Sequence, residues 1–520
     1  MTMRKIGGLL AAMLLAGCSS NGGDAAPGTA APVPTPNPPV ARNACADPEA
    51  DIEPSCFLQG NAANLVRTVC GVAWLPGLCN TVAFEDPQYR VEADPHPGAP
   101  YFLAIGTVHE HSSYSDGDPQ QIPRDYFAAG RDGHNTADAG GDTGIRVDFM
   151  LSSEHSDNEK LPVTTSAACI PIGTDLSPGT LSPTVLANLV SCAHTGDLDH
   201  YFKWQATLQQ ALDGSSAGFT AMRGFEWTND YYNHMNVYLS TNVVNAKVDG
   251  SYVGMNFMWR WLQTPVDQGG GADALAAFNH PGSKPALTPF DGDLPHNELL
   301  ARLGNANWND LAHVPEVDAR VVGIEVNGGD DLSWYVKALQ QGWHVGPLGA
   351  EDEHQREWST RSKPKTVMLV RGRDPQDYYH ALQNRRTMAL RPELVGGAPG
   401  EKASFPQIRY WADGSGLQDG IPLGTIVRDS AAHTLHVDIE GLPAGTRVSL
   451  MAGDAEQAAP MALGVADAGG RYQGSQAVSA PGSGQRWYFL LLCPAAETQC
   501  GSSEEYLGVT APIWFAPAEG

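Results

Sequence analysis

One pattern recurs from about residue 98 to residue 390: a short apolar run ends on a histidine, an aspartate or a glutamate. Segments with helical periodicity lie between these runs, for example 199–212, 333–341 and 375–386. Apolar strands that alternate with helices form parallel β/α units, so the pattern restricts this part of the chain to an α/β fold. The runs and their polar ends are 101–105 with His109 and His111, 147–151 with Glu154 and His155, 219–225 with Glu226, 275–278 with Asn279 and His280, 321–324 with Glu325, and 344–348 with Asp352 and His354.

Polar side chains at the carboxyl ends of successive strands are the active-site arrangement of α/β barrels. We therefore expect a catalytic barrel over 98–398. The pattern changes beyond it, where 433–439 alternates with period two and 447–451, 486–492 and 511–515 are further strand candidates. Gly, Pro and Asp separate these strands, which predicts a small antiparallel β-sandwich over 399–520.

The first 18 residues have the features of a bacterial export signal. Arg4 and Lys5 are followed by the apolar run 7–16, which is too short to span a bilayer as a mature helix. Leu15-Ala16-Gly17-Cys18 resembles the lipoprotein box, whose cysteine carries a lipid and anchors the mature chain to a membrane. An ordinary secretory signal with a nearby cysteine is the alternative. We expect residues 19–43, rich in Gly, Ala and Pro, to be a linker. We expect the chain to be exported to the bacterial cell envelope and anchored by a lipid, at the outer membrane or on the periplasmic or extracellular face.

The chain contains nine cysteines, and Cys18 leaves an even number for pairing. An even number in an exported chain predicts disulfides. Spacing favours the pairs 45–56, 70–79, 169–192 and 493–500, although spacing alone does not fix connectivity. The first two pairs lie in a cysteine-bearing segment, 44–97, that precedes the barrel. No CxxC motif occurs, which argues against a cysteine-bound structural zinc.

The charge balance excludes one class of partner. Lysine and arginine total 32 and the acidic residues 58, so the formal charge is 32 − 58 = −26. Nucleic acid binding needs a basic surface, so we expect no nucleic-acid docking surface. An anionic small molecule remains compatible with this charge, because bound metal ions dominate the local field of a site.

His109-Glu110-His111 is the sharpest local motif. Alternate residues of an extended segment point the same way, so both imidazoles can face one metal ion. An HxH by itself is only moderately specific, and Asp116-Gly117 by itself reads as a tight turn. Together, in His109-Glu-His-Ser-Ser-Tyr-Ser-Asp-Gly117, they place a carboxylate shortly after the histidine pair.

In this motif and in four later ones the chain resembles the PHP superfamily of polymerase and histidinol phosphatase domains. The resemblance covers roughly 98–390 and is greatest to the branch with a carbamate-hydrolysing enzyme, in which a β domain follows the barrel. Two positions depart from the family pattern: Glu154 replaces an aspartate that is generally not a ligand, and Glu351-Asp352 lengthens the last motif by one residue. The matching segments are 109–117, Glu154-His155, Gly224-Phe-Glu226 with His234, Asn279-His280-Pro281, and 349–354.

The resemblance implies a distorted (β/α)7 barrel with two or three divalent ions, Zn, Mn or Fe. Carried over by position, the first ion takes His109, His111, Glu226 and Asp352. The second shares Glu226 and adds His234 and His280, and the third takes Asp116, His155 and His354. We expect Glu325 to support these ligands rather than to bind metal.

These features predict an exported metal-dependent hydrolase in which metal-bound hydroxide attacks a small-molecule substrate. A phosphate ester is the favoured substrate. The sequence leaves two alternatives open: hydrolysis of a carboxylic ester, carbamate or amide by the same metals, and a non-catalytic lipoprotein that only binds a ligand. Neither a GxSxG elbow nor a P-loop occurs. Trp227, Tyr231 and Tyr232 are interpreted either as a substrate wall or as core aromatics.

Overall fold

The computed structural model describes much of the chain outside its N-terminus. By internal contacts the chain divides into residues 1–42 and 43–520, and every described residue belongs to the second unit. The predicted signal peptide, the linker, Cys18 and the cysteine pairs 70–79 and 169–192 lie outside the described residues. The described residues are 44–59, 89–118, 121–135, 141–156, 203–248, 251–283, 307–414, 420–429, 431–478, 484–497, 500–501 and 505–518.

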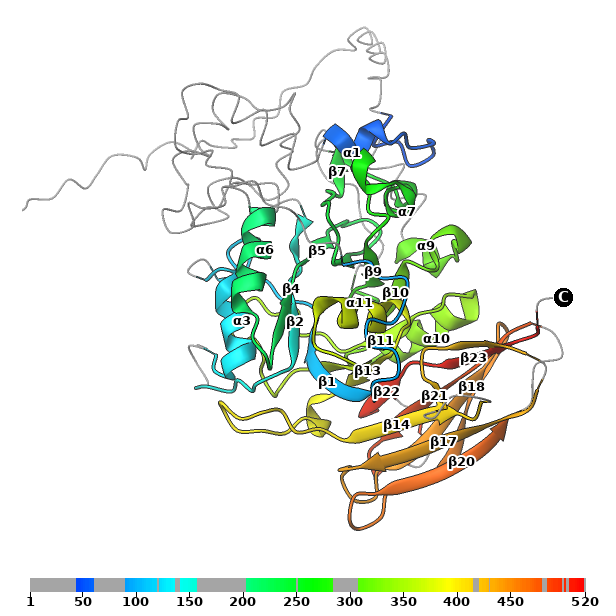
Figure 1. Ribbon diagram of the computed structural model, residues 1–520. Helices are drawn as coiled ribbons and strands as arrows, with labels where there is room; N and C mark the ends of the chain where they lie inside the picture. Colours follow the sequence, from blue (N-terminus) through cyan, green and yellow to red (C-terminus); the bar gives the residue numbers. More distant parts are fainter. Residues whose placement is uncertain are drawn as a thin grey trace, which may run out of the picture. The chain divides into compact units, whose positions relative to one another are not determined.

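The fold is mixed α/β, as the alternation of runs predicts (Figure 1). A six-stranded sheet has the order β11-β10-β9-β6-β5-β3, and an eleven-stranded sheet begins β4-β2-β1-β12-β13 and continues into the C-terminal strands. The predicted apolar runs coincide with strands of these two sheets. Their bounds are β1 Phe102–Thr107, β2 Phe149–Leu151, β3 Glu154–His155, β4 Thr220–Met222, β5 Gly224–Trp227, β6 Met235–Tyr238, β9 Leu275–Phe278, β10 Val321–Glu325, β11 Gly346–Leu348, β12 Lys365–Val370 and β13 Thr387–Leu390.

The two sheets meet where two chain segments bend from one into the other. Ser152 and Ser153 separate β2 from β3, and Arg223 separates β4 from β5. Gly224 is needed at this bend, because a Cβ there would lie 2.7 Å from the backbone oxygens of Ser152 and Val237. Among the described residues no ladder joins β11 to β12, so the sheets are not closed by hydrogen bonds and the predicted distorted barrel is not confirmed.

Strand direction departs from an all-parallel arrangement at two places. The pairs β1–β2, β2–β4, β3–β5, β9–β10 and β10–β11 are parallel, as expected. Strand β6 is antiparallel to both of its neighbours, and β12 is antiparallel to both β1 and β13. The short connection from Trp227 to Met235 explains β6, because a parallel neighbour requires a crossover of about a dozen residues or more.

Helices cover these sheets and share their core. Helix α3 packs on α6 and β2, α10 packs on β10, and α11 contacts β4, β9, β10 and β12. Apolar side chains of both sheets and of α11 form one buried cluster, which includes Ala104, Phe149, Leu275, Leu348 and Tyr378. The helical bounds are α1 Ser55–Gln59, α3 Pro123–Asp132, α6 Lys203–Gly214, α7 Met255–Gln263, η2 Val266–Gln268, α9 Trp308–Leu311, η3 Pro315–Val317, α10 Asp331–Gln341, α11 Pro375–Gln383 and η4 Pro392–Leu394.

The C-terminal strands form two layers around a second apolar cluster. A four-stranded sheet, β15-β14-β17-β20, lies against strands of the large sheet, which β22 joins to β13. Strand β17 buries every other residue, as its period-two pattern predicts. The bounds are β14 Gln407–Ala412, β15 Ile421–Pro422, β16 Ile426–Arg428, β17 His433–Glu440, β18 Arg447–Gly453, β19 Ala458–Val465, β20 Tyr472–Val478, β21 Arg486–Cys493, β22 Gly508–Thr510 and β23 Ile513–Ala516, and a separate hairpin pairs β7 Lys247–Val248 with β8 Ser251–Tyr252.

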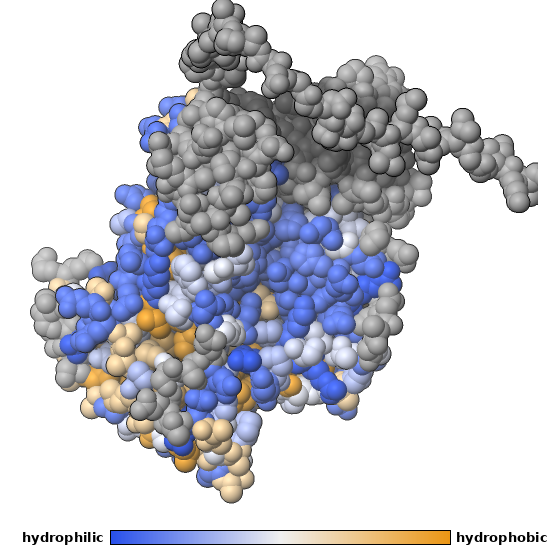
Figure 2. All heavy atoms as spheres, turned by 180° about the vertical axis from the view of Figure 1, so that it is seen from behind, coloured by the Kyte–Doolittle hydropathy of each residue, from blue (hydrophilic) through white to orange (hydrophobic). Residues whose placement is uncertain are grey.

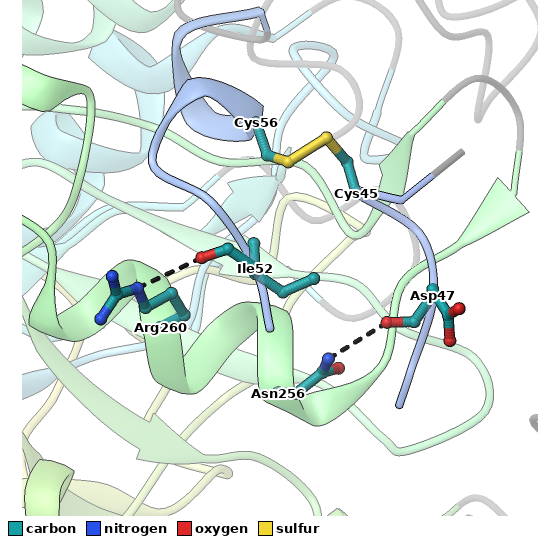
Figure 3. The surroundings of a disulfide bond; sticks show 6 residues. All are labelled: Cys45, Asp47, Ile52, Cys56, Asn256 and Arg260. Carbon is teal, nitrogen blue, oxygen red and sulfur yellow. Dashed lines mark hydrogen bonds between the residues drawn. A yellow bond between two sulfur atoms is a disulfide. The ribbon is translucent and has the colours of Figure 1, made fainter. Parts of the chain in front are cut away.

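Two of the predicted disulfides are present, Cys45–Cys56 and Cys493–Cys500. The first closes a loop that lies against helix α7 (Figure 3). The Asn256 side chain donates to the Asp47 carbonyl at 3.1 Å, and the Arg260 guanidinium donates to the Ile52 carbonyl at 3.2 Å. The disulfide loop is thus held to the α/β part by hydrogen bonds as well as by burial.

The surface seen from the back is mostly hydrophilic (Figure 2). Apolar side chains gather toward the lower left of that view, over the C-terminal strands. Each helix in the described residues is too short or too polar to cross a membrane.

Candidate metal centre

The predicted ligands gather at one edge of the six-stranded sheet and the adjoining end of β1. Parallel strands end at the same edge, which brings together residues that follow β1, β9 and β11 with His155 at the end of β3 and Glu226 in β5. Because β6 is antiparallel, it starts at this edge, which explains why His234 precedes a strand instead of following one. The assembled residues are His109, His111, Asp116, His155, Glu226, His234, His280, Asp352 and His354.

Glu226 lies at the centre of the group. Its side chain is 1% exposed and faces five imidazoles. In the described part of the chain its ion-pair partners are all histidines, with neither lysine nor arginine among them. The nitrogen–oxygen distances are 3.4 Å to His109, 3.8 Å to His111, 2.8 Å to His155, 3.0 Å to His234 and 3.1 Å to His280.

The predicted first group has the spacing of ligands around one ion. His109 Nε2 and His111 Nε2 each lie 3.4 Å from Asp352 Oδ1, and they lie 3.0 Å from each other. Four ligands at about 2.0–2.1 Å from a tetrahedral zinc ion are about 3.3–3.4 Å apart. These distances, with the 3.4 Å from His109 to Glu226, therefore match a shared coordination shell.

The other two groups meet at His155. His155 Nε2 is 3.3 Å from Asp116 Oδ1, which His354 Nε2 approaches to 3.0 Å. Through Nδ1 the same imidazole faces Glu226, so His155 also belongs to a cluster with Glu226 and His234. The expected second group, in contrast, placed His280 beside Glu226 and His234. His280 does approach Glu226, and His155 is an additional member that the sequence did not indicate.

The electrostatics of the centre fit a bound cation. Glu325 Oε1 lies 2.6 Å from His109 Nδ1, so that nitrogen carries the proton donated to Glu325, and the Nε2 lone pair is left to hold a metal ion or a second proton. This lone pair faces Glu226 and Asp352, which are both negative. Glu226 Oε2 is buried and accepts no hydrogen bond, although His155 Nδ1 lies near it outside hydrogen-bond geometry. Such an arrangement of electron pairs is repulsive unless a cation lies between them.

The pKa shifts point the same way. Burial alone would raise the pKa of Glu226, but the surrounding histidines outweigh it and hold the pKa well below its usual range. Burial disfavours charge on His109, yet the carboxylates of Asp352, Glu325 and Glu226 raise its pKa well above 6.5. Burial and the neighbouring imidazoles lower the pKa of His111 to about 3. His111 is therefore neutral, the form in which an imidazole binds metal.

Backbone conformation at the centre is unusual at three positions. Asn233, His280 and Asp352 have φ angles of 83°, 30° and 48°. Non-glycine residues rarely occupy this left-handed region, and each costs of the order of 1–3 kcal/mol. Two of the three are predicted ligands and the third precedes His234, so the strain coincides with the candidate site.

Several residues that support the centre were not predicted. Thr228 Oγ1 lies 2.7 Å from His155 Nδ1, and Asn279 Nδ2 donates to Glu226 at 2.8 Å. Asn279 directly precedes His280 at a strand end, a position that would have indicated it. Thr228 carries no such signal. The predicted supporting residue Glu325 contacts His109 and also accepts the backbone N–H of His280 at 2.7 Å.

Trp227, Tyr231 and Tyr232 belong to the largest buried apolar cluster. They are 0%, 3% and 2% exposed. These three residues are therefore core aromatics and not a substrate wall.

Comparison with known proteins gives only distant matches. No family model and no curated protein matches the chain. A two-domain protein from Bacteroides vulgatus, described as containing a predicted PHP-like metal-dependent phosphoesterase, is 16% identical over 82% of this chain and 100% of its own, with a TM-score of 0.35. An engineered protein is 12% identical over 79% of this chain and 100% of its own, with a TM-score of 0.16. Both TM-scores are low.

Proposed function

We propose that the protein is a metal-dependent hydrolase with two or three divalent ions at the Glu226 centre. The observation that carries this proposal is the buried Glu226 carboxylate among five imidazoles, with Asp352 and Asp116 nearby and no lysine or arginine pairing with any of the three in the described residues. Imidazole and carboxylate ligands suit Zn, Mn or Fe. When bound, such ions acidify water and neutralise charge on the scissile group.

Exposure indicates where a substrate enters. The His109, His111 and Glu226 side chains are at most 1% exposed, whereas Asp116 and Asp352 are 34% and 39% exposed. The open side of the centre thus lies at Asp116, Asp352 and the neighbouring His354. The buried side holds the ligands in place through Glu325 and keeps bulk water away from Glu226.

A phosphate ester is the substrate class that we propose. In the described residues the centre pairs its carboxylates only with imidazoles, so bound metal would be its main positive charge. That charge suits an anionic substrate despite the acidic chain. The sequence resemblance to PHP phosphoesterases agrees with this choice. Carboxylic esters and carbamates, the substrates suggested by one branch of that superfamily, form the alternative arm of the test.

The test is a substrate screen on protein that lacks residues 1–43. Apoprotein would be loaded with Mn or Zn and assayed against phosphomonoesters, phosphodiesters, carboxylic esters and carbamates. We expect phosphate-ester hydrolysis that chelation removes and His109→Ala abolishes. His134→Ala is the matched control, because its side chain is 61% exposed and pairs with Asp142 outside the centre. Cleavage of carboxylic esters alone would overturn the phosphoesterase assignment, and the absence of all hydrolysis would favour a binding lipoprotein.

We also propose that the chain is exported and anchored through a lipid on Cys18. The disulfides Cys45–Cys56 and Cys493–Cys500 support export, because such bonds persist in oxidising compartments. Metabolic labelling with palmitate should mark the full-length protein and not Cys18→Ser. Equal labelling of the two would contradict the anchor.

A further inference from the structure

A buried carboxylate, that of Glu154, is connected to His111 of the metal centre through the Ser115 hydroxyl. Glu154 is fully buried and lies outside the predicted ligand set. Its Oε2 accepts the Ser115 hydroxyl at 2.5 Å, and Ser115 Oγ lies 3.1 Å from His111 Nδ1. Its Oε1 accepts the Ser112 hydroxyl at 2.5 Å. Glu154 therefore touches two serines of the 109–117 segment, and only one of these touches a histidine.

The direction of these hydrogen bonds follows from their chemistry. The Ser115 proton goes to the Glu154 carboxylate, so the Ser115 oxygen can only accept from His111. His111 Nδ1 must then carry the ring proton, and its Nε2 keeps the lone pair. That Nε2 is the atom that lies 3.0 Å from His109 Nε2 and 3.4 Å from Asp352 Oδ1.

His111 has a second neighbour on its Nδ1 side. Asp116 Oδ1 lies 3.9 Å from Nδ1, within reach of a metal that bridges the two but too far for a hydrogen bond. The closer contact to Ser115 occupies Nδ1 instead. His111 can therefore bind a metal ion together with His109 and Asp352 through Nε2. Its Nδ1 is occupied by Ser115 and does not bind with the group around Asp116.

The arrangement parallels the one at the other histidine of the motif. His109 Nδ1 contacts the Glu325 carboxylate directly at 2.6 Å, and a carboxylate behind a metal-binding imidazole fixes both tautomer and ring orientation. At His111 the carboxylate acts through a hydroxyl.

We propose that Glu154 and Ser115 form a relay that positions His111 Nε2 toward the metal shared with His109 and Asp352. This inference rests on the proposed metal centre. Glu154 is in this account a positioning residue and not a ligand.

Ser112 provides the matched control. Ser112→Ala and Ser115→Ala each remove one buried hydroxyl that donates to Glu154, but only Ser115→Ala removes the contact to His111. Zinc affinity would be measured by chelator competition on apoprotein, beside thermal unfolding of each apo variant. We expect Ser115→Ala to bind the weakened ion about 10–100-fold less tightly, and Ser112→Ala to stay within about threefold of the wild type. Ser115→Thr keeps the hydroxyl and should restore the affinity.

The outcomes separate the relay from the metal centre itself. Equal zinc affinities for the two alanine variants would overturn the relay, and so would failure of Ser115→Thr to restore binding in a folded apoprotein. Wild-type protein that binds no zinc would instead contradict the proposed metal centre.

Discussion

The segments 109–111 and 351–353 each present two opposite faces. The buried carboxylates on the two faces have different ion-pair partners. His109, His111 and Asp352 point to the metal-centre side, which we call the front. The intervening glutamates Glu110, Glu351 and Glu353 form, with Lys363 and Lys365, a rear cluster. Backbone bonds hold the segments together, with Glu110 bridged to Glu353. The alternation of an extended chain produces both clusters from the same few residues.

The rear cluster contains its own cations. Lys365 Nζ lies 2.6 Å from Glu351 and is fully buried, and Lys363 Nζ lies 2.7 Å from Glu353. Burial raises the pKa of Glu110 and of Glu351, and Lys365 opposes the shift in both. At the front, the carboxylates of the described residues have only imidazoles as ion-pair partners. The difference indicates that the rear is a structural cluster, and it supports the metal site that we propose at the front.

The largest effect should come from neutralising the central front carboxylate. Glu226→Gln removes the negative charge that the proposed ions share, so we expect hydrolysis to fall by at least about a hundredfold to a thousandfold and metal content to drop. Glu353→Gln makes the same chemical change in the rear cluster and should retain metal and activity. Activity assays with elemental analysis check both variants, and equal losses would remove the distinction between the two faces.

Breaking the rear cluster should affect stability. Lys365→Met leaves Glu351 buried without its cation, and we expect the free energy of unfolding of the apoprotein to fall by about 3–5 kcal/mol. Lys337→Met is the control, because its side chain is 36% exposed, its partner Asp310 is 68% exposed, and a solvated pair contributes about 1 kcal/mol or less. Urea denaturation measures both, and a loss no greater for Lys365→Met than for Lys337→Met would contradict the structural role.

A disulfide loop that supplies no predicted ligand sharpens the comparison. Replacing Cys45 and Cys56 with serine opens the loop that lies on α7, and we expect a stability loss of about 2–4 kcal/mol with no change in metal content. The Cys493–Cys500 pair closes a shorter loop and should cost less when replaced. A loss of bound metal in the Cys45/Cys56 variant would show that the two regions are not independent.

The smallest effect concerns a carboxylate that forms no ion pair with a histidine or a lysine in the part of the chain that the structure describes. Burial raises the pKa of Asp331 to about 7, above its unfolded value. A raised folded pKa contributes stability below the unfolded pKa that is lost as pH rises through about 7. Asp331→Asn should therefore gain about 1–3 kcal/mol over the wild type on going from pH 4 to pH 8. The neighbouring exposed Asp330→Asn should show little change, and identical urea-denaturation profiles for the two variants would contradict the assignment.

Much of this arrangement could be predicted from the sequence, because the residues at the end of a strand are a local feature of the chain. Apolar runs that end on His, Asp or Glu predicted β9 and β10 almost to the residue and indicated which side chains would meet. The antiparallel direction of β6 was not visible, because its apolar residues read the same in either direction. The open junction between β11 and β12 likewise depends on pairing between distant segments.

The residues that contact the predicted ligands were harder to predict from the sequence than the ligands themselves. Glu154 and His111 are joined only through Ser115, which in the sequence is one of three serines in a row of polar residues. The pair of Glu351 and Lys365 depends on which face of each segment turns inward. Side-chain direction of this kind follows from tertiary packing, and spacing along the chain does not encode it.

The most direct test of the central claim is the number of metal ions per chain. Protein without residues 1–43, purified under metal-replete conditions, would be measured by inductively coupled plasma mass spectrometry beside Glu226→Gln. We predict at least two divalent ions per wild-type chain and fewer in the variant. Fewer than one ion per wild-type chain would contradict the account.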